Sequence, residues 1–109
     1  MKKELQIAMN SWVENAYEIM KKELQDMLPF CSTRLRFCNA YVLETKNFYV
    51  LRSYQTIVAC IRKDCLQSYD FLRMVYGYTA ISAQHISKFF HDYGDSRIVP
   101  YVYRDIKSL

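Results

Sequence analysis

The spacing of apolar residues changes abruptly at Pro29, and this change limits what the chain can fold into. Before Pro29, apolar side chains recur every three or four residues, which is the period of an amphipathic helix. This stripe consists of Leu5, Met9, Trp12, Val13, Ala16, Tyr17, Met20, Leu24, Met27 and Leu28. A proline pushes the residue before it out of the helical conformation. The sequence therefore predicts one long helix within residues 1–28, with its stripe, Trp12 included, packed on a sheet.

After Pro29 the apolar residues alternate, which is typical of half-buried strands. Together with short turns, this predicts an antiparallel meander over residues 33–76, with strands at 33–44, 48–53, 54–62 and 68–76. The unbroken apolar run at 57–61 indicates that the third strand is central. A last strand is expected over residues 97–106. Because Pro100 lacks an N–H group, that strand should lie at a sheet edge or carry a bulge.

A second helix is predicted over residues 82–93, ending before Gly94. Ser82 is the candidate N-cap residue, because its side chain can accept a hydrogen bond from the first helical turn. The element order is then helix, four strands, helix and strand. This order predicts a single α+β domain over residues 1–109. We expect an antiparallel sheet of four to five strands, covered on one face by both helices in a two-layer arrangement.

The chain carries no catalytic signature that we can recognise. Its two glycines cannot form a Gly-rich phosphate loop. His85 and His91 lie about 240° apart around a helix and cannot bind one metal together. The four cysteines contain no Cys-x-x-Cys pair. We therefore expect a protein without catalytic residues, cofactor or metal, with free buried thiols; a disulfide and a Cys–His pair remain alternatives.

No apolar run approaches the roughly 18 residues needed to span a bilayer. The basic start of the chain is not followed by the apolar core of a signal peptide. We expect a cytoplasmic protein without membrane contact. The sequence leaves open whether it is a monomer or a dimer.

Positive charge is concentrated in the predicted sheet. Residues 2–28 hold four basic and five acidic groups, a net charge of −1, whereas residues 29–109 hold eleven basic and six acidic groups, a net charge of +5. Arginine binds phosphates and carboxylates in bidentate fashion, and the ten tyrosines suit a binding surface as well as half-buried strands. The candidate binding residues are Arg34, Arg36, Arg52, Tyr54, Arg73, Arg97 and Arg104. The alternative is a solvated outer sheet face.

Residues 53–59 and 78–89 form a recognisable pattern, a Ser-Tyr-x-Thr strand followed by a Ser-x-x-His-Ile-x-x-Phe helix. The helical part is Ser82, His85, Ile86 and Phe89. The pattern resembles a small domain of phage and mobile-element proteins of gut bacteria whose function is unassigned. In physical terms, a neutral His85 in the first helical turn is placed to hydrogen-bond Ser53 or Thr56. We interpret the motif as a structural tie between helix and sheet.

The resemblance and the small size of the chain imply a non-enzymatic protein that acts by binding. The leading hypothesis is an inhibitor of a host nucleic-acid-handling defence complex, similar in kind to anti-CRISPR proteins. Its partner would be a protein such as a CRISPR effector, inhibited by occlusion. One alternative is an accessory protein that binds nucleic acid directly through Arg and Tyr side chains on the sheet. Another is a structural or dimerising protein, which would expose the Met-rich helix face.

Overall fold

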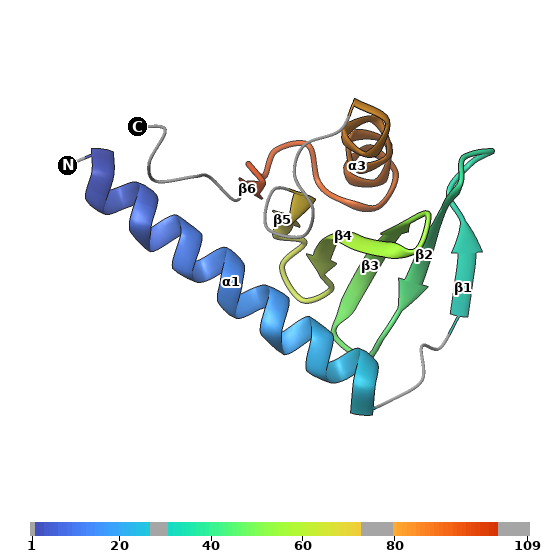
Figure 1. Cartoon of the computed structure of the whole chain (residues 1–109), viewed down its shortest axis with the longest axis horizontal. Helices are drawn as coiled ribbons and strands as arrows, with labels where there is room; N and C mark the ends of the chain where they lie inside the picture. The colour runs from blue at the N-terminus through green and yellow to red at the C-terminus, as the bar shows by residue number, and fades with distance from the viewer. Residues whose placement is uncertain (1, 27–30, 73–79, 103–109) are drawn as a thin grey trace.

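The computed structural model describes residues 2–26, 31–72 and 80–102 of the chain (Figure 1). Its elements follow in the order α1 (Lys2–Asp26), β1 (Cys31–Arg34), β2 (Ala40–Glu44), β3 (Phe48–Ser53), β4 (Thr56–Arg62), β5 (Ser68–Asp70), α3 (Ala80–Tyr93) and β6 (Tyr101–Val102). The strands form one sheet in sequential order. Strands β1 to β5 pair antiparallel, whereas β6 pairs parallel to β5. The α+β class is confirmed, but the sheet is mixed and has six strands.

The extra strand arises because the strand predicted at 33–44 is in fact two. The chain turns back between β1 and β2, and the turn is closed by a hydrogen bond from the Cys38 amide to the Leu35 carbonyl, 3.0 Å. Arg36 occupies a left-handed conformation in this turn, with φ of 52°. No glycine or proline marks the position, so the sequence pattern missed it.

Two other predicted strands are shorter in the structure. The strand predicted at 68–76 ends at Asp70, because the Asp70 carboxylate accepts a hydrogen bond from the Leu72 amide, 2.9 Å, and turns the chain. In the predicted strand 97–106, only β6 is present among the described residues, directly after Pro100 and at the edge of the sheet, as expected. Residues 73–76 and 103–106 of these predictions lie outside the described residues.

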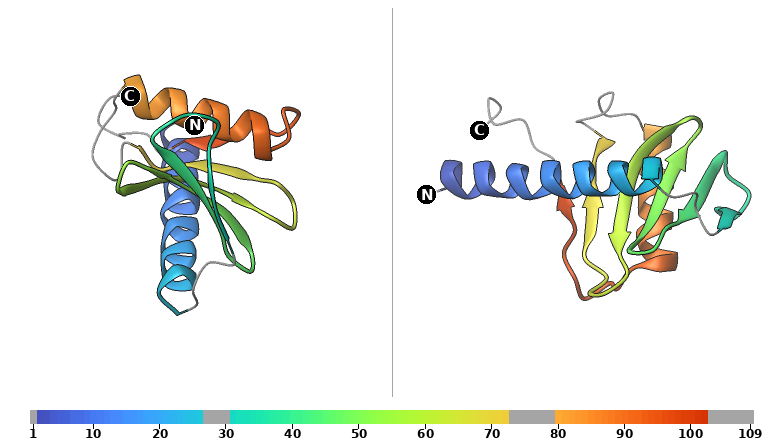
Figure 2. Two further views of the ribbon diagram at one scale, coloured as in Figure 1. Left: turned by 90° about the vertical axis from the view of Figure 1, so that its right-hand side faces the viewer. Right: turned by 90° about the horizontal axis from the view of Figure 1, so that it is seen from below.

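The two helices lie on opposite faces of the sheet, so the predicted two-layer arrangement is wrong (Figure 2, left). Along β4, Ala59 and Ile61 pack in a core under α3, whereas Cys60 packs in a core with Val13 and Met20 of α1. Both faces of a strand covered in this way are apolar, which explains the unbroken run at 57–61. The central position predicted for this strand is confirmed.

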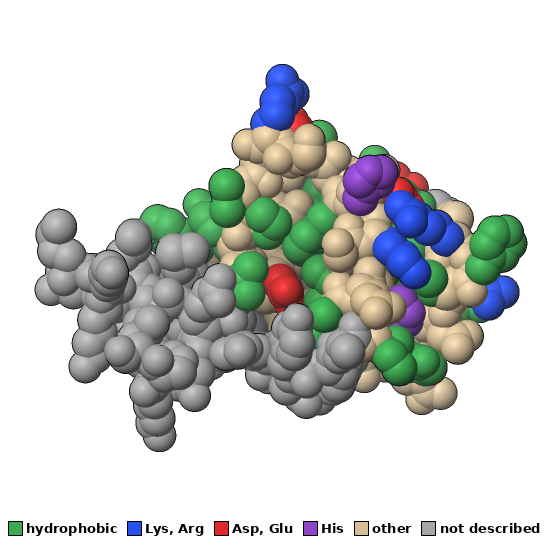
Figure 3. Space-filling view, turned by 90° about the horizontal axis from the view of Figure 1, so that it is seen from above, with side chains coloured by type: hydrophobic (Ala, Val, Ile, Leu, Met, Phe, Trp, Pro, Cys, Tyr) green, Lys and Arg blue, Asp and Glu red, His purple; other side chains and the backbone are tan. Residues whose placement is uncertain are grey.

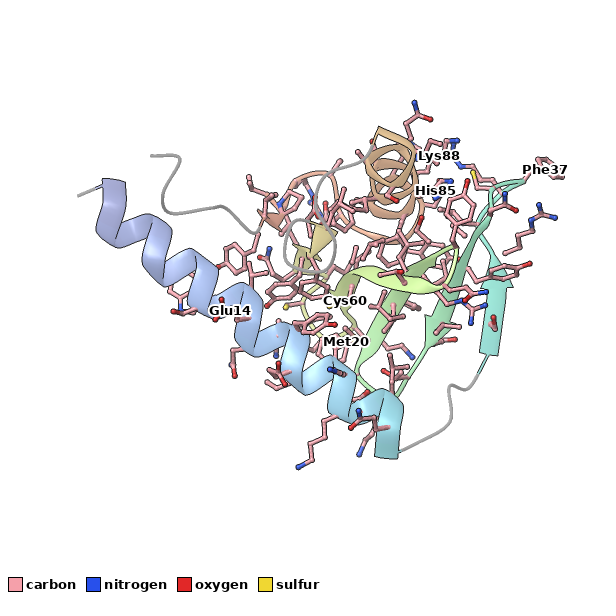
Figure 4. The ribbon with its side chains drawn as sticks, in the orientation of Figure 1. Glu14, Met20, Phe37, Cys60, His85 and Lys88 are labelled. Atoms are coloured by element: carbon pink, nitrogen blue, oxygen red, sulfur yellow. The ribbon has the colours of Figure 1, made fainter. Side chains whose placement is uncertain are left out.

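Helix α1 buries Val13, Ala16 and Met20 against the sheet, and Met20 faces Cys60 (Figure 4). Trp12, predicted to be core, is 50% exposed, as is Ile19. The apolar stripe of the helix is therefore wider than the surface that the sheet covers.

Helix α3 is tied to the sheet by polar side chains. The Ser53 hydroxyl lies 2.8 Å from His85 Nδ1 and 3.3 Å from the Ser82 hydroxyl, and all three residues are buried. The expected bond between His85 and the sheet is thus present. The N-cap role predicted for Ser82 is wrong, since α3 begins at Ala80 and Ser82 lies inside the helix. Ile86 and Phe89 are buried in the core under α3.

Candidate binding surface at the hairpin end

Phe37 is the most exposed large apolar side chain among the described residues. It lies at the tip of the β1–β2 hairpin, 95% exposed, and points away from the molecule (Figure 4). An exposed Phe leaves unused about 1.5–3 kcal/mol of stabilisation that its burial would supply. We call the surface around it the hairpin end, which consists of the described residues Arg34, Phe37, Asn39, Tyr41, Arg52, Tyr54, Gln55 and Thr56.

The tip that carries Phe37 is held by hydrogen bonds on both sides. The Leu35 amide donates to the Ala40 carbonyl, 2.9 Å, and Arg34 Nε donates to the Cys38 carbonyl, 2.9 Å. The Leu35 side chain is 1% exposed and is part of the core under α3. Phe37 is therefore presented by a turn whose neighbours are fixed in place.

Arg36 fastens the same turn to α3. Its guanidinium makes two hydrogen bonds to the Asp92 carboxylate, 2.8 and 2.6 Å, and these offset the left-handed backbone at Arg36. Hydrogen bonds from Arg36 and then from His91 hold the pKa of Asp92 well below its ordinary range. A further contact joins Lys88 Nζ to Cys38 Sγ, 3.4 Å. Because Asp92 neutralises it, Arg36 contributes little to the positive charge that we predicted for binding.

Arg34, Tyr41 and Arg52 form one row across three neighbouring strands. Arg34 of β1 is opposite Tyr41 of β2, which is opposite Arg52 of β3. Directly opposed residues of antiparallel strands share a face. The Arg52 guanidinium lies over the Tyr41 ring, 5.3 Å from its centroid. Neither arginine forms an ion pair within the described residues, so the row keeps both positive charges.

A hollow of about 470 Å³ lies beside this row, between the hairpin and the β3–β4 turn. It is lined by Asn39, Tyr41, Tyr54, Gln55 and Thr56. Tyr54 is 52% exposed and has a left-handed backbone, with φ of 56°. Its amide donates to the Asn39 carbonyl, 2.8 Å, which joins the two walls of the hollow.

Lysine, arginine and histidine side chains gather over this end of the molecule, next to a projecting apolar group (Figure 3). Of the predicted binding residues, the structure brings together Arg34, Arg52 and Tyr54. Arg97 lies in the loop after α3 and is paired with Asp95, 2.9 Å. Arg73 and Arg104 lie outside the described residues.

Sequence reasoning missed Phe37, Asn39 and Tyr41 as parts of a surface. In a single strand over residues 33–44, Phe37 would share a face with Leu35 and Tyr41, because strand faces repeat every two residues. The available signal was Asn39, a polar residue common in turns, which interrupts that apolar face.

A second concave region lies between α1 and the β4–β5 turn. This groove of about 650 Å³ is lined by Trp12, Ile19, Tyr69 and Tyr101 among other residues. Arg62, which also lines it, is paired with Asp64, 2.7 Å. The groove is lined by apolar and polar side chains in similar measure, and its arginine is already neutralised.

The remaining chemical groups fit structural roles. Ser53 is 1% exposed, so its bond to His85 is out of reach of a substrate. Among the described residues, Cys38, Cys60 and Cys65 are free thiols; Cys60 is buried, as expected, whereas Cys65 is exposed. Burial raises the pKa of Cys60 well above its ordinary value. In the described part of the chain, no three His, Cys, Asp or Glu residues are grouped as metal ligands require, and neither helix is long and apolar enough to cross a membrane.

Comparison with known proteins finds no family model that matches this chain, and no curated protein and no solved structure that is significantly similar to it.

Proposed function

We propose that this protein acts by binding, without catalysis, and inhibits a nucleic-acid-handling defence complex of a bacterial host. It does so by occluding a surface of that complex, in the way that anti-CRISPR proteins do, with the hairpin end as its contact surface. The defence complex as partner comes from the resemblance to mobile-element domains. The choice of the hairpin end as contact surface is supported by the exposure of Phe37 and by the charges of Arg34 and Arg52.

The observation that carries the proposal is the 95% exposure of Phe37 on a fixed turn. Aromatic side chains that enter a pocket on the partner dominate the energy of many interfaces. A fixed turn loses little conformational entropy on binding, which raises affinity. The charges of Arg34 and Arg52 beside Phe37 complement an acidic protein surface or a phosphate backbone.

The proposal is tested in bacterial strains in which a CRISPR effector of known type destroys an incoming plasmid. Expression of the wild-type protein should restore transformation by the targeted plasmid in at least one strain. Arg52→Glu should abolish this protection, because it reverses one charge of the row. Lys46→Glu is the matched control, since Lys46 is exposed in the turn at the other end of β2. Full protection by Arg52→Glu, or no protection by the wild type in any strain, would contradict the proposal.

Direct binding of nucleic acid is the second candidate function. The specific observation that favours it is the row of Arg34, Tyr41 and Arg52 beside a hollow walled by tyrosines. Protection without any measurable contact with nucleic acid would argue against it. Tight binding to free DNA or RNA without effect on any effector would favour it over inhibition.

A further inference from the structure

The two tyrosines of the hollow offer flat surfaces at the hairpin end. The Arg52 guanidinium packs over one face of the Tyr41 ring. The Tyr54 backbone is positioned by the hydrogen bond that its N–H donates to the Asn39 carbonyl. Successive bases of single-stranded nucleic acid stack on aromatic side chains presented in this way. The hollow, of about 470 Å³, is shallow and largely open to solvent, so a base would rest against its tyrosines and would not be enclosed.

The remaining lining residues supply hydrogen-bonding groups. The side chains of Asn39, Gln55 and Thr56 line the hollow and make no hydrogen bond within the described part of the chain. Amide groups donate and accept at once, as the edges of bases require. A ligand in the hollow would therefore find both stacking surfaces and unused polar groups.

The row beside the hollow supplies positive charge. Arg52 is positioned by packing on Tyr41 and not by an acidic side chain, and its buried Nε makes no hydrogen bond among the described residues. Arg34 is exposed on the same face, two strands away. The guanidinium groups of Arg34 and Arg52 are therefore placed to bind the phosphates on either side of a base that lies in the hollow.

We propose that the hollow binds one unstacked base of a single-stranded nucleic acid, with Arg34 and Arg52 on the neighbouring phosphates. This inference deepens the second candidate function and does not require a defence complex to be the target. A duplex is a poorer ligand, because its bases are stacked on one another and present no free face. With few charges involved, binding is modest in strength.

The test is fluorescence anisotropy with an eight-nucleotide, fluorescein-labelled DNA strand of mixed sequence, alone and annealed to its complement. The single strand should bind more tightly than the duplex. For two phosphate contacts, the slope of log K against log salt should be about −1.4, since each contact on a single strand contributes about −0.7. Arg52→Gln should reduce this slope by about 0.7. Lys46→Gln, at the other end of β2, should leave it unchanged.

The base contact is tested separately from the charges. Tyr54→Ala should weaken single-strand binding roughly 5- to 150-fold without changing the salt slope, which corresponds to the loss of one base stack. If Tyr54→Ala proves unstable, Gln55→Ala serves instead, because it removes a hydrogen-bonding group from the hollow and leaves the charge unchanged. Circular dichroism confirms that each variant is folded.

Three results would overturn the inference: preference for the duplex, no binding of the single strand, or equal binding by wild type, Arg52→Gln and the hollow variants. These results are distinct from failure of the proposed inhibition. If the wild-type protein does not bind the single strand but still protects the plasmid, the base-binding inference is rejected and the inhibitor proposal stands. If the wild-type protein binds the single strand but protects no strain, the inhibitor proposal is rejected and the base-binding inference stands.

Discussion

The turns at the two ends of β2 are both fastened to a helix by a carboxylate, yet they present opposite surfaces. At the β2–β3 turn, Glu23 of α1 accepts hydrogen bonds from the Thr45 hydroxyl, 2.6 Å, and the Asn47 amide, 2.7 Å. Thr45 and Phe48, which lie on either side of this turn, are buried, with 1% and 4% exposed. At the β1–β2 turn, Asp92 of α3 holds Arg36, and the adjacent Phe37 is 95% exposed.

This difference separates stability from binding. A rigid turn by itself indicates only good packing, as the β2–β3 turn shows. Single exposed apolar side chains are common on protein surfaces. What distinguishes the β1–β2 turn is that Phe37 lies at the same end of the molecule as Arg34 and Arg52, which form no ion pair in the described part of the chain. The hairpin end is therefore the better candidate for a contact surface. Variants at the β2–β3 turn should mainly reduce stability, and variants at the β1–β2 turn should mainly reduce binding.

The largest expected effect comes from the two phenylalanines. Phe48→Ala should lower the free energy of unfolding by about 3–5 kcal/mol, because it opens a cavity in the core under α1. Phe37→Ala should change it by no more than about 0.5 kcal/mol, as surface substitutions do. Urea unfolding followed by circular dichroism measures both. Comparable losses in the two variants would show that Phe37 has a structural role.

Loss of the Glu23 carboxylate at the β2–β3 turn should reduce stability more than loss of the Asp92 carboxylate at the β1–β2 turn. Burial opposes ionisation of Glu23, but the hydrogen bonds from Thr45 and Asn47 prevail and lower its pKa. Glu23→Ala should therefore cost about 1–3 kcal/mol, since it leaves the buried Thr45 hydroxyl without this acceptor. Asp92→Ala removes an exposed ion pair and should cost at most about 1 kcal/mol. The ranking is measured by urea unfolding at neutral pH, and the reverse ranking would contradict it.

The fold could be predicted from the sequence where its periodic patterns were long. The switch of period at Pro29 gave α1 and the meander, and the run at 57–61 gave the central strand. The same unbroken run also indicates that both faces of β4 are covered, and the predicted arrangement with both helices on one face overlooked this signal. The hairpin tip was missed because Arg36 adopts a left-handed backbone that residues other than glycine rarely take.

The candidate site was predictable only in its charges. Arg34 and Arg52 stood out as basic residues of strands, and the structure places them in one row. Arg36 could not be set apart, because its partner Asp92 is remote in sequence. Phe37 could not be identified as exposed until the turn that carries it was known.

A smaller, pH-dependent effect should arise at the tie between α3 and the sheet. Burial, and then the charge of Lys88, lower the pKa of His85. The unfolded chain therefore binds a proton at His85 more readily than the folded chain. Stability should be full above about pH 6.5, the ordinary value for histidine, and should fall as the pH drops below it.

Urea unfolding between pH 7.5 and 5 measures this dependence. His85→Asn should flatten it, because it removes the titrating group at this tie. An unchanged slope in His85→Asn would show that another group is responsible.

The most direct test of the hairpin end compares two exposed aromatic side chains, Phe37 at the tip of the β1–β2 hairpin and Trp12 in the groove beside α1. Phe37→Ala and Trp12→Ala are assayed for plasmid protection in a strain that the wild-type protein protects. If the hairpin end is the contact surface, Phe37→Ala loses protection, through a fall in partner affinity of about 30-fold or more for a dominant anchor, and Trp12→Ala keeps it. Full protection by Phe37→Ala together with loss in a folded Trp12→Ala would place the contact in the groove beside α1 and contradict the account.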